Sequence, residues 1–364
     1  MPELPAATIA ALAGALGGAV LGIAARLGRF CTLAAIEDTL YAGDRRRFRM
    51  WVLAMAVAIL GVGIISALGL IDITKSFYHR QPINLVAWII GGLMFGIGMA
   101  FCGTCAFGSL VRFGGGDLKS FTVCLVLGIS AYMAVAGPTA MLRVQLLDPL
   151  VLPDTIIVQR TLVDFAGGPS STLAHAVTIL LAATLACWTM TSRRFRTSAR
   201  NLIWGVIVGG TILFGWIATG WLAHDPFNPQ IMRSFTFSLP PGQMLMYLMT
   251  MSGGVLTFAI ASTFGVIAGS LVGAILKREF RWEAADDARE TRRHVLGAFL
   301  MGTGGVFAGG CTIGQGLSAV SVTAISAPIV LASIWLGAWL GLTYLIEGSV
   351  LGTLRVAFGL AQRT

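Results

Sequence analysis

About nine apolar stretches, most of them near the roughly 20 residues that a helix needs to cross a lipid bilayer, follow one another along the chain. Only 11% of the 364 residues are charged, whereas a soluble domain carries about 25%. A soluble enzyme, a nucleic-acid-binding protein and a disordered scaffold are therefore excluded. Because no strand pattern competes, the sequence predicts an all-α polytopic membrane protein in a lipid bilayer. The expected spans are 6–27, 50–71, 83–101, 119–141, 172–191, 202–223, 243–276, 294–309 and 326–346.

The distribution of arginine and lysine predicts which ends of the spans face the cell interior. If the N-terminus lies outside, the basic connectors 45–49, 193–200 and 277–293 all lie inside, where positive charge gathers in membrane proteins. The C-terminus then lies inside as well. The stretch 243–276 is too long for one straight crossing, and its Gly-rich run at 252–254 predicts a break.

One segment of the chain recurs at a fixed distance. Residues 96–108 and 302–314 share the pattern G-x-G-x-x-F-x-G-x-C-x-x-G, which places Cys105 and Cys311 at equivalent positions 206 residues apart. The same offset carries three spans of the first half onto regions that overlap spans of the second half. We therefore expect a single membrane domain of two four-helix repeats, 6–141 and 202–346. The linker helix 172–191 between them inverts the second repeat relative to the first.

The repeated pattern predicts two broken helices that line a transport path. Glycine on either side of a cysteine lets the backbone leave helical geometry and approach a ligand closely. A helix that restarts after a break presents free N–H groups to an anion, and the cysteine adds a weakly donating, polarizable thiol. The candidate path residues in these two loops are Gly103, Cys105, Gly108, Gly309, Gly310, Cys311 and Gly314.

Three further residues are candidates for contact with a transported anion. Cys31 follows the first span beside Arg29, and a packing role and a functional role are equally open for it. Arg112 follows the first cysteine loop, where it either neutralises an anion or extends to the membrane surface. Gln315 follows the second loop and has an amide to donate.

The first loop also contains a C-x-x-C pair, Cys102 and Cys105, which raises the alternative of a membrane thiol–disulfide oxidoreductase. Cys102 aligns with Ala308 in the second loop, so the pair does not belong to the repeated pattern. Cys124 and Cys187 lie within apolar spans and are expected to be packing residues. The four histidines lack the spacing of metal ligands, and no phosphate-binding loop is present, so neither a metal nor a cofactor is expected.

The cysteine motifs resemble those of the YeeE/YedE family of sulfur-transport membrane proteins. The similar segments are Gly28-Arg29-Phe30-Cys31, Gly103-Thr104-Cys105-Ala106-Phe107-Gly108 and Gly309-Gly310-Cys311-Thr312-Ile313-Gly314. The resemblance implies a bacterial inner-membrane protein, with its N-terminus periplasmic and its C-terminus cytoplasmic, that takes up thiosulfate. It also implies a relay that runs from Cys105 through Cys311 to Cys31, and a separate cytoplasmic protein as any sulfur carrier. At positions 102 and 104 the family more commonly has small residues, whereas this chain has Cys102 and Thr104. This difference concerns the first binding step and therefore the exact substrate.

The sequence thus predicts a transporter, not an enzyme, that moves a small sulfur-containing anion inward, with thiosulfate as the first candidate. The oxidoreductase is the main competing hypothesis. A sensor that binds a sulfur species without transporting it is a third, and it differs from a transporter by binding without flux.

Overall fold

A computed structural model of the chain describes residues 5–151, 160–168, 171–223, 231–284 and 287–349. Its secondary structure is helical, and in these ranges the only β-type pairings are isolated bridges. The all-α prediction is therefore confirmed. The expected locations of the two termini concern residues 1–4 and 350–364, which lie outside the described residues.

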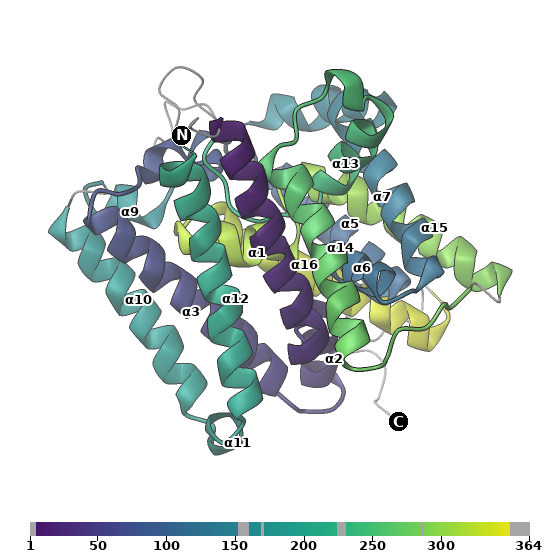
Figure 1. Ribbon diagram of the computed structural model, residues 1–364, viewed down its shortest axis with the longest axis horizontal. Coiled ribbons are helices and arrows are strands. Elements are labelled where there is room, and N and C mark those ends of the chain that lie inside the picture. The colour runs from purple at the N-terminus through teal and green to yellow at the C-terminus, as the bar shows by residue number, and fades with distance from the viewer. Residues whose placement is uncertain (1–4, 152–159, 169–170, 224–230, 285–286, 350–364) are drawn as a thin grey trace.

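The helices follow the apolar stretches of the sequence closely. Figure 1 shows their arrangement. The first half contains α1 (Ala6–Gly28), α2 (Thr32–Leu40), α3 (Arg46–Ala67), η1 (Ile73–Lys75), α4 (Phe77–Arg80), α5 (Leu85–Cys102), α6 (Ala106–Gly114), α7 (Leu118–Ala136), α8 (Pro138–Leu142), η2 (Arg143–Leu147) and η3 (Asp148–Leu150). The second half contains α9 (Leu162–Phe165), α10 (Thr172–Met190), α11 (Arg193–Arg196), α12 (Ala199–Ile217), η4 (Ala218–Leu222), α13 (Pro240–Met249), η5 (Met251–Gly253), α14 (Phe258–Leu276), α15 (Ala288–Phe307), η6 (Gly314–Ala319) and α16 (Ser326–Glu347).

Eight helices in the described part of the chain are long and apolar enough to cross a membrane. The helices at which these eight stretches start are α1, α3, α5, α7, α10, α12, α14 and α16. The remaining expected span, 294–309, coincides with most of α15, whose first two turns carry several charges. The expected break in 243–276 is also present, because α13 ends at Met249 and α14 begins only at Phe258.

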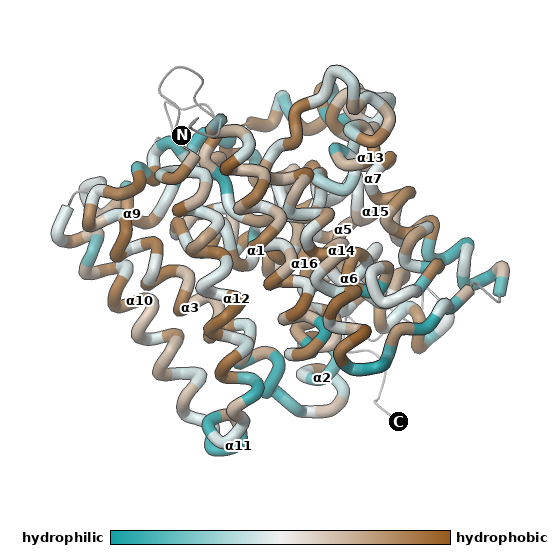
Figure 2. The backbone as a smooth tube through the Cα atoms, in the orientation of Figure 1, coloured by the Kyte–Doolittle hydropathy of each residue, from teal (hydrophilic) through white to brown (hydrophobic). Residues whose placement is uncertain are grey.

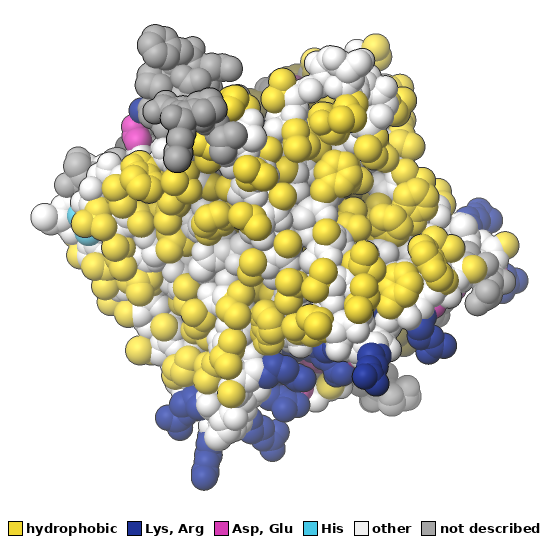
Figure 3. Space-filling model, viewed as in Figure 1, with side chains coloured by type: hydrophobic (Ala, Val, Ile, Leu, Met, Phe, Trp, Pro, Cys, Tyr) yellow, Lys and Arg dark blue, Asp and Glu magenta, His cyan; other side chains and the backbone are white. Residues whose placement is uncertain are grey.

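The surface has the character of a membrane protein. Apolar side chains cover the flank of the helical bundle, and many large ones are exposed, among them Leu16, Ile179 and Leu180 (Figures 2 and 3). Lys and Arg side chains gather at one end of the bundle, the end that contains α11 (Figures 1 and 3). An apolar flank of this kind is stable in lipid and not in water. The chain is a multi-pass membrane protein.

The helices pack in pairs that come from opposite halves of the chain. α1 lies along α14 and α3 along α12, while α5 lies along α16 and α7 along α15. α5 and α15, the two helices that precede the cysteine loops, also pack against each other. Small residues permit this close approach, as they commonly do between helices in membranes. The cysteine loops therefore meet in the middle of the bundle.

Candidate functional site

Three cysteines follow the same local design. In each case a helix ends, the residue two positions before the cysteine adopts a left-handed conformation, and a new helical segment begins just after the cysteine. The left-handed residues are Arg29 (φ 56°), Gly103 (φ 66°) and Gly309 (φ 69°), which precede Cys31, Cys105 and Cys311. Gly103 and Gly309 are equivalent in the sequence repeat, and glycine adopts this conformation without steric cost. The two predicted helix breaks are confirmed.

The thiols of Cys105 and Cys311 occupy equivalent positions at the start of their new helical segments. The N–H of Gly108 donates to Cys105 Sγ at 3.4 Å, and the N–H of Gly314 donates to Cys311 Sγ at the same distance. Cys311 Sγ also accepts a bond of 3.2 Å from the N–H of Phe237. Each sulfur thus accepts a hydrogen bond from a backbone N–H at the start of its new helical segment, where free N–H groups favour negative charge.

The three cysteine motifs converge on one another. The Cys105 thiol lies beside the side chains of Thr32, which follows Cys31, and Thr312, which follows Cys311. Thr312 Oγ1 is buried and has no hydrogen-bond partner in the described part of the chain. Cys105 and Cys311 are buried, and Cys31 is partly exposed. The local breaks therefore bring thiols and hydroxyls close to one another inside the bundle.

A cavity of about 280 Å³ reaches the second cysteine loop. Its wall includes Gly309 and Thr236, and Thr236 Oγ1 lies 3.8 Å from Cys311 Sγ. Two cations, Arg143 and Arg233, also line it, together with the amides Gln81 and Gln243. The start of α13 forms part of the cavity wall. The cavity therefore lies at the end of the bundle opposite α11 and its arginines (Figure 1). Cys311 is thus the cysteine beside this cavity.

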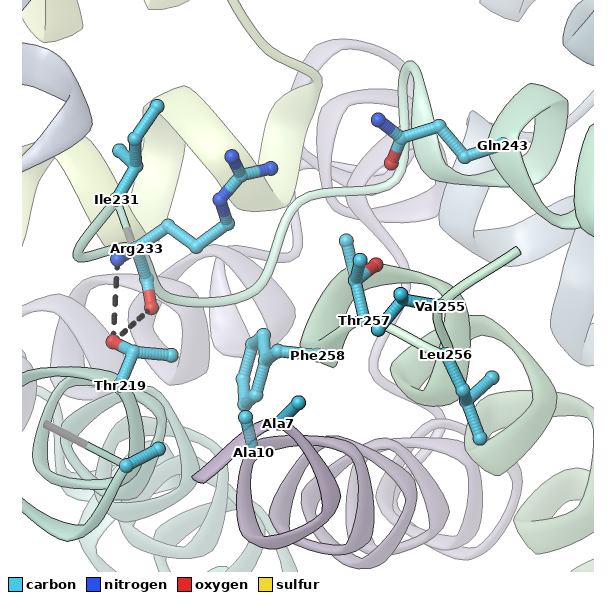
Figure 4. Close-up of a pocket in the computed structure, with 12 residues that line it drawn as sticks. Ala7, Ala10, Thr219, Ile231, Arg233, Gln243, Val255, Leu256, Thr257 and Phe258 are labelled. Carbon is cyan, nitrogen blue, oxygen red and sulfur yellow. Dashed lines mark hydrogen bonds between the residues drawn. The ribbon is translucent and has the colours of Figure 1, made fainter. Parts of the chain in front are cut away.

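A smaller cavity of about 110 Å³ adjoins the same region (Figure 4). Arg233 and Gln243 line both cavities, and the start of α14, including Thr257 and Phe258, closes the smaller one. Neither Arg233 nor Thr236 was predicted as a site residue from the sequence. No pattern singles out either residue, because both lie in a connector between two spans that shows no helical periodicity.

Arg112 and Gln315 form hydrogen bonds with backbone carbonyls at the two helix breaks. Arg112 Nη2 donates to the carbonyl of Gly103 at 2.9 Å, and the Arg112 side chain is exposed. Gln315 is fully buried, where its Nε2 donates to the carbonyl of Ala308 at 3.0 Å and its Oε1 accepts from Ser326 Oγ at 3.1 Å. Both side chains therefore satisfy carbonyl groups that the helix breaks leave free.

The remaining cysteines lie apart from this arrangement. Cys102 is buried between α5 and α15, where its Sγ donates to the carbonyl of His294 at 3.3 Å. Cys124 is buried, as expected of a packing residue, but Cys187 is exposed on α10, so the packing prediction for it is wrong. Helix α10 packs against α3 along one side only, which leaves Cys187 on the open side. All six cysteines are free thiols.

The fold and the paired, glycine-flanked cysteine breaks are those of a multi-pass membrane transport protein. The chain belongs to the Sulphur transport family, whose model matches residues 27–340. It is 26% identical to the thiosulfate transporter TsuA of Escherichia coli (strain K12), over 93% of this chain and 92% of that protein. It is 25% identical to the thiosulfate transporter TsuA of Spirochaeta thermophila (strain ATCC 700085 / DSM 6578 / Z-1203), over 90% of this chain and 96% of that protein.

Proposed function

We propose that this protein carries thiosulfate inward across the bacterial inner membrane along a path of cysteine thiols. The observation that carries the proposal is the convergence of three helix breaks with cysteines at equivalent positions, one of them beside a cavity lined by two arginines. The two TsuA relatives, which span nearly the whole chain, support thiosulfate as the substrate.

The proposed orientation places the N-terminus in the periplasm and the C-terminus in the cytoplasm. The arginines at the α11 end of the bundle mark the cytoplasmic side under the positive-inside rule (Figure 3). The larger cavity then opens toward the periplasm. The order of contact is Cys311, then Cys105, then Cys31, because Cys311 borders the cavity and Cys105 lies beside Thr32, next to Cys31. This order differs from the one that the family resemblance implies, in which Cys105 comes first.

Two inverted repeats, 6–141 and 202–346, joined by the linker helix 172–191, fit the observed packing. In the proposed repeats, α1 is equivalent to α12, α3 to α14, α5 to α15 and α7 to α16. Replacing each helix by its equivalent turns the α1–α14 pair into the α12–α3 pair, and the α5–α16 pair into the α15–α7 pair. The α5–α15 pair maps onto itself. This proposed symmetry supports a location of the two cysteine loops near the middle of the bilayer, where transporters of this design hold their substrates.

The thiols suit a sulfur anion because they bind it weakly and at several points. Thiosulfate has a polarizable terminal sulfur and three oxygens. A thiol offers a weak S–H donor and a soft sulfur contact, while N–H groups such as those of Gly108 and Gly314 stabilise the charge. Passage between sites requires binding strong enough to admit the anion and weak enough to release it. On the cytoplasmic side, a separate sulfur-carrier protein would receive the sulfur.

Growth of a bacterium that lacks its own sulfate and thiosulfate uptake tests this function. With thiosulfate as the only sulfur source, cells that produce this protein should grow, and cells with the empty vector should not. Equal expression is checked by immunoblotting of membranes. Absence of growth with well-expressed protein would contradict thiosulfate uptake, and binding of thiosulfate without growth would favour the sensor hypothesis.

The Cys102→Ala variant separates the transporter from the oxidoreductase. We expect this variant to take up thiosulfate at the wild-type rate, because Cys102 packs between α5 and α15 and donates to the carbonyl of His294. A dithiol oxidoreductase would lose its activity when either cysteine of the pair is removed. Uptake of radiolabelled thiosulfate into whole cells provides the measurement. Loss of uptake in Cys102→Ala with normal expression would support the dithiol chemistry instead.

A further inference from the structure

Arg233 lines two cavities at the proposed outer end of the path. It lies in a non-helical segment between η4 and α13, where it lines both the larger and the smaller cavity. Its backbone is fixed by Thr219: the N–H of Arg233 donates to Thr219 Oγ1 at 3.2 Å, and its carbonyl accepts from the same hydroxyl at 2.7 Å. In Figure 4 its side chain extends away from Thr219 into the space in front of Gln243. The backbone of Arg233 is therefore held in place, while its guanidinium extends into the cavities that it lines.

The guanidinium of Arg233 has no negative partner among the residues that the structure describes. It is partly buried, and no Asp or Glu of the described residues lies within ion-pair distance of it. A buried cation without a counter-charge is costly to hold. An arginine kept in that state marks a site where the missing negative charge is supplied by a ligand.

The surrounding groups complete a site for an oxyanion. Gln243, which lines both cavities with Arg233, has a buried Oε1 without a hydrogen-bond partner, so its amide is free to turn toward a ligand. Arg143 brings a second cation to the larger cavity. It is already partly neutralised, since its Nε lies 3.6 Å from Asp148 Oδ2 and its Nη1 donates to the carbonyl of Ala134. Arg233 is thus the stronger source of positive charge of the two.

From this arrangement we infer that Arg233 is the capture residue of a distinct outer binding site that selects doubly charged sulfur oxyanions before they reach Cys311. The inference rests on the proposed uptake function. One unpaired and one partly paired guanidinium match a dianion better than a monoanion. The cavity of about 280 Å³ holds a small tetrahedral anion together with a few waters. Because Arg233 borders both cavities, an anion in either one contacts the same guanidinium.

Thiosulfate binding to the purified, detergent-solubilised protein tests the inference directly. Arg233→Gln should raise the Kd about 10- to 100-fold, the loss expected when a charge-assisted hydrogen-bonded pair is removed. Arg233→Lys, which keeps the charge but not the planar fork, should bind with intermediate affinity. The matched control is Arg80→Gln, because Arg80 is an exposed arginine at the same end of the bundle and lines neither cavity.

A second variant keeps the test decisive if Arg233→Gln folds poorly. Gln243→Met preserves the side-chain length, removes the amide, and should raise the Kd several-fold. Competition with sulfate and thiocyanate reports the charge selectivity. Wild type should prefer the dianion sulfate over the monoanion thiocyanate as a competitor, and Arg233→Gln should lose this preference.

Different experimental results would contradict the proposed cysteine path and the proposed outer site. Cys124→Ala, which removes a buried thiol that belongs neither to the path nor to the lining of either cavity, should bind thiosulfate with the affinity of the wild type. Absence of uptake by wild type would contradict the proposed function. Uptake by wild type combined with an unchanged Kd in both Arg233→Gln and Gln243→Met would overturn the role of Arg233. An equal loss of affinity in Arg80→Gln would also overturn it, because general surface charge would then explain the effect.

Discussion

Replacing Cys311 with alanine should reduce thiosulfate uptake to the level of the empty vector, and replacing Cys105 should do the same. Cys311 Sγ is held by the N–H groups of Phe237 and Gly314 beside the larger cavity, and Cys105 Sγ occupies the equivalent position in the other repeat. Alanine leaves the backbone donors in place and removes the only soft, polarizable contact between them. Radiolabelled thiosulfate uptake into cells, corrected for the amount of protein in the membrane, measures the loss.

Two further variants distinguish a lost thiol contact from a disturbed fold. Cys311→Ser keeps the size and hydrogen-bonding capacity of the side chain, so it tests whether sulfur itself is needed, and we expect uptake to remain far below wild type. Cys124→Ala removes a buried thiol on α7 that lies on no proposed path, and its uptake should be normal. Normal uptake in both Cys105→Ala and Cys311→Ala would refute the cysteine path.

Replacing Gly18 with leucine should prevent the accumulation of stable folded protein. Gly18 lies in the α1–α14 contact, where a Cβ atom would meet the backbone carbonyl of Ser262 more closely than real Cβ atoms approach any neighbour. Gly14 and Gly22, one helical turn away on either side, face α14 in the same manner. Backbone atoms cannot rotate away as a flexible side chain can, so the helices must separate. The cost should exceed the ~1–3 kcal/mol typical of one over-packed core position.

Gly210→Leu provides the matched control for this prediction. Gly210 lies in the middle of α12, and a Cβ atom built on it would meet nothing within 4 Å. Both substitutions remove one helical glycine and add the same side chain, so they differ only in the space available. Yield after detergent extraction and the unfolding temperature should fall sharply for Gly18→Leu and stay near wild type for Gly210→Leu. Equal behaviour of the two variants would show that close α1–α14 contact does not limit stability.

The helices, the helix breaks and the equivalence of the two cysteine loops could all be predicted from the residues alone. These features depend on local chemistry: apolar runs of about 20 residues must be helical in lipid, and glycine at positions 103 and 309 permits the left-handed turn that ends each helix. The offset of 206 residues linked Cys105 to Cys311 before any contact was known. The same local reasoning predicted the interruption between α13 and α14.

Which side chains meet around the path depends on how the helices pack. Arg233 stands in a segment without helical periodicity, so no pattern in the sequence indicated that it faces two cavities, and Thr236 was equally hidden beside Cys311. Gln315 and Arg112, which were candidates for substrate contact, donate to the carbonyls of Ala308 and Gly103, and no sequence pattern indicated these partners. Sequence spacing fixes the conformation of a helix and its ends because the backbone hydrogen bonds there join near neighbours. The partner of a buried side chain is fixed by how distant helices pack, and that is settled only when the whole bundle has assembled.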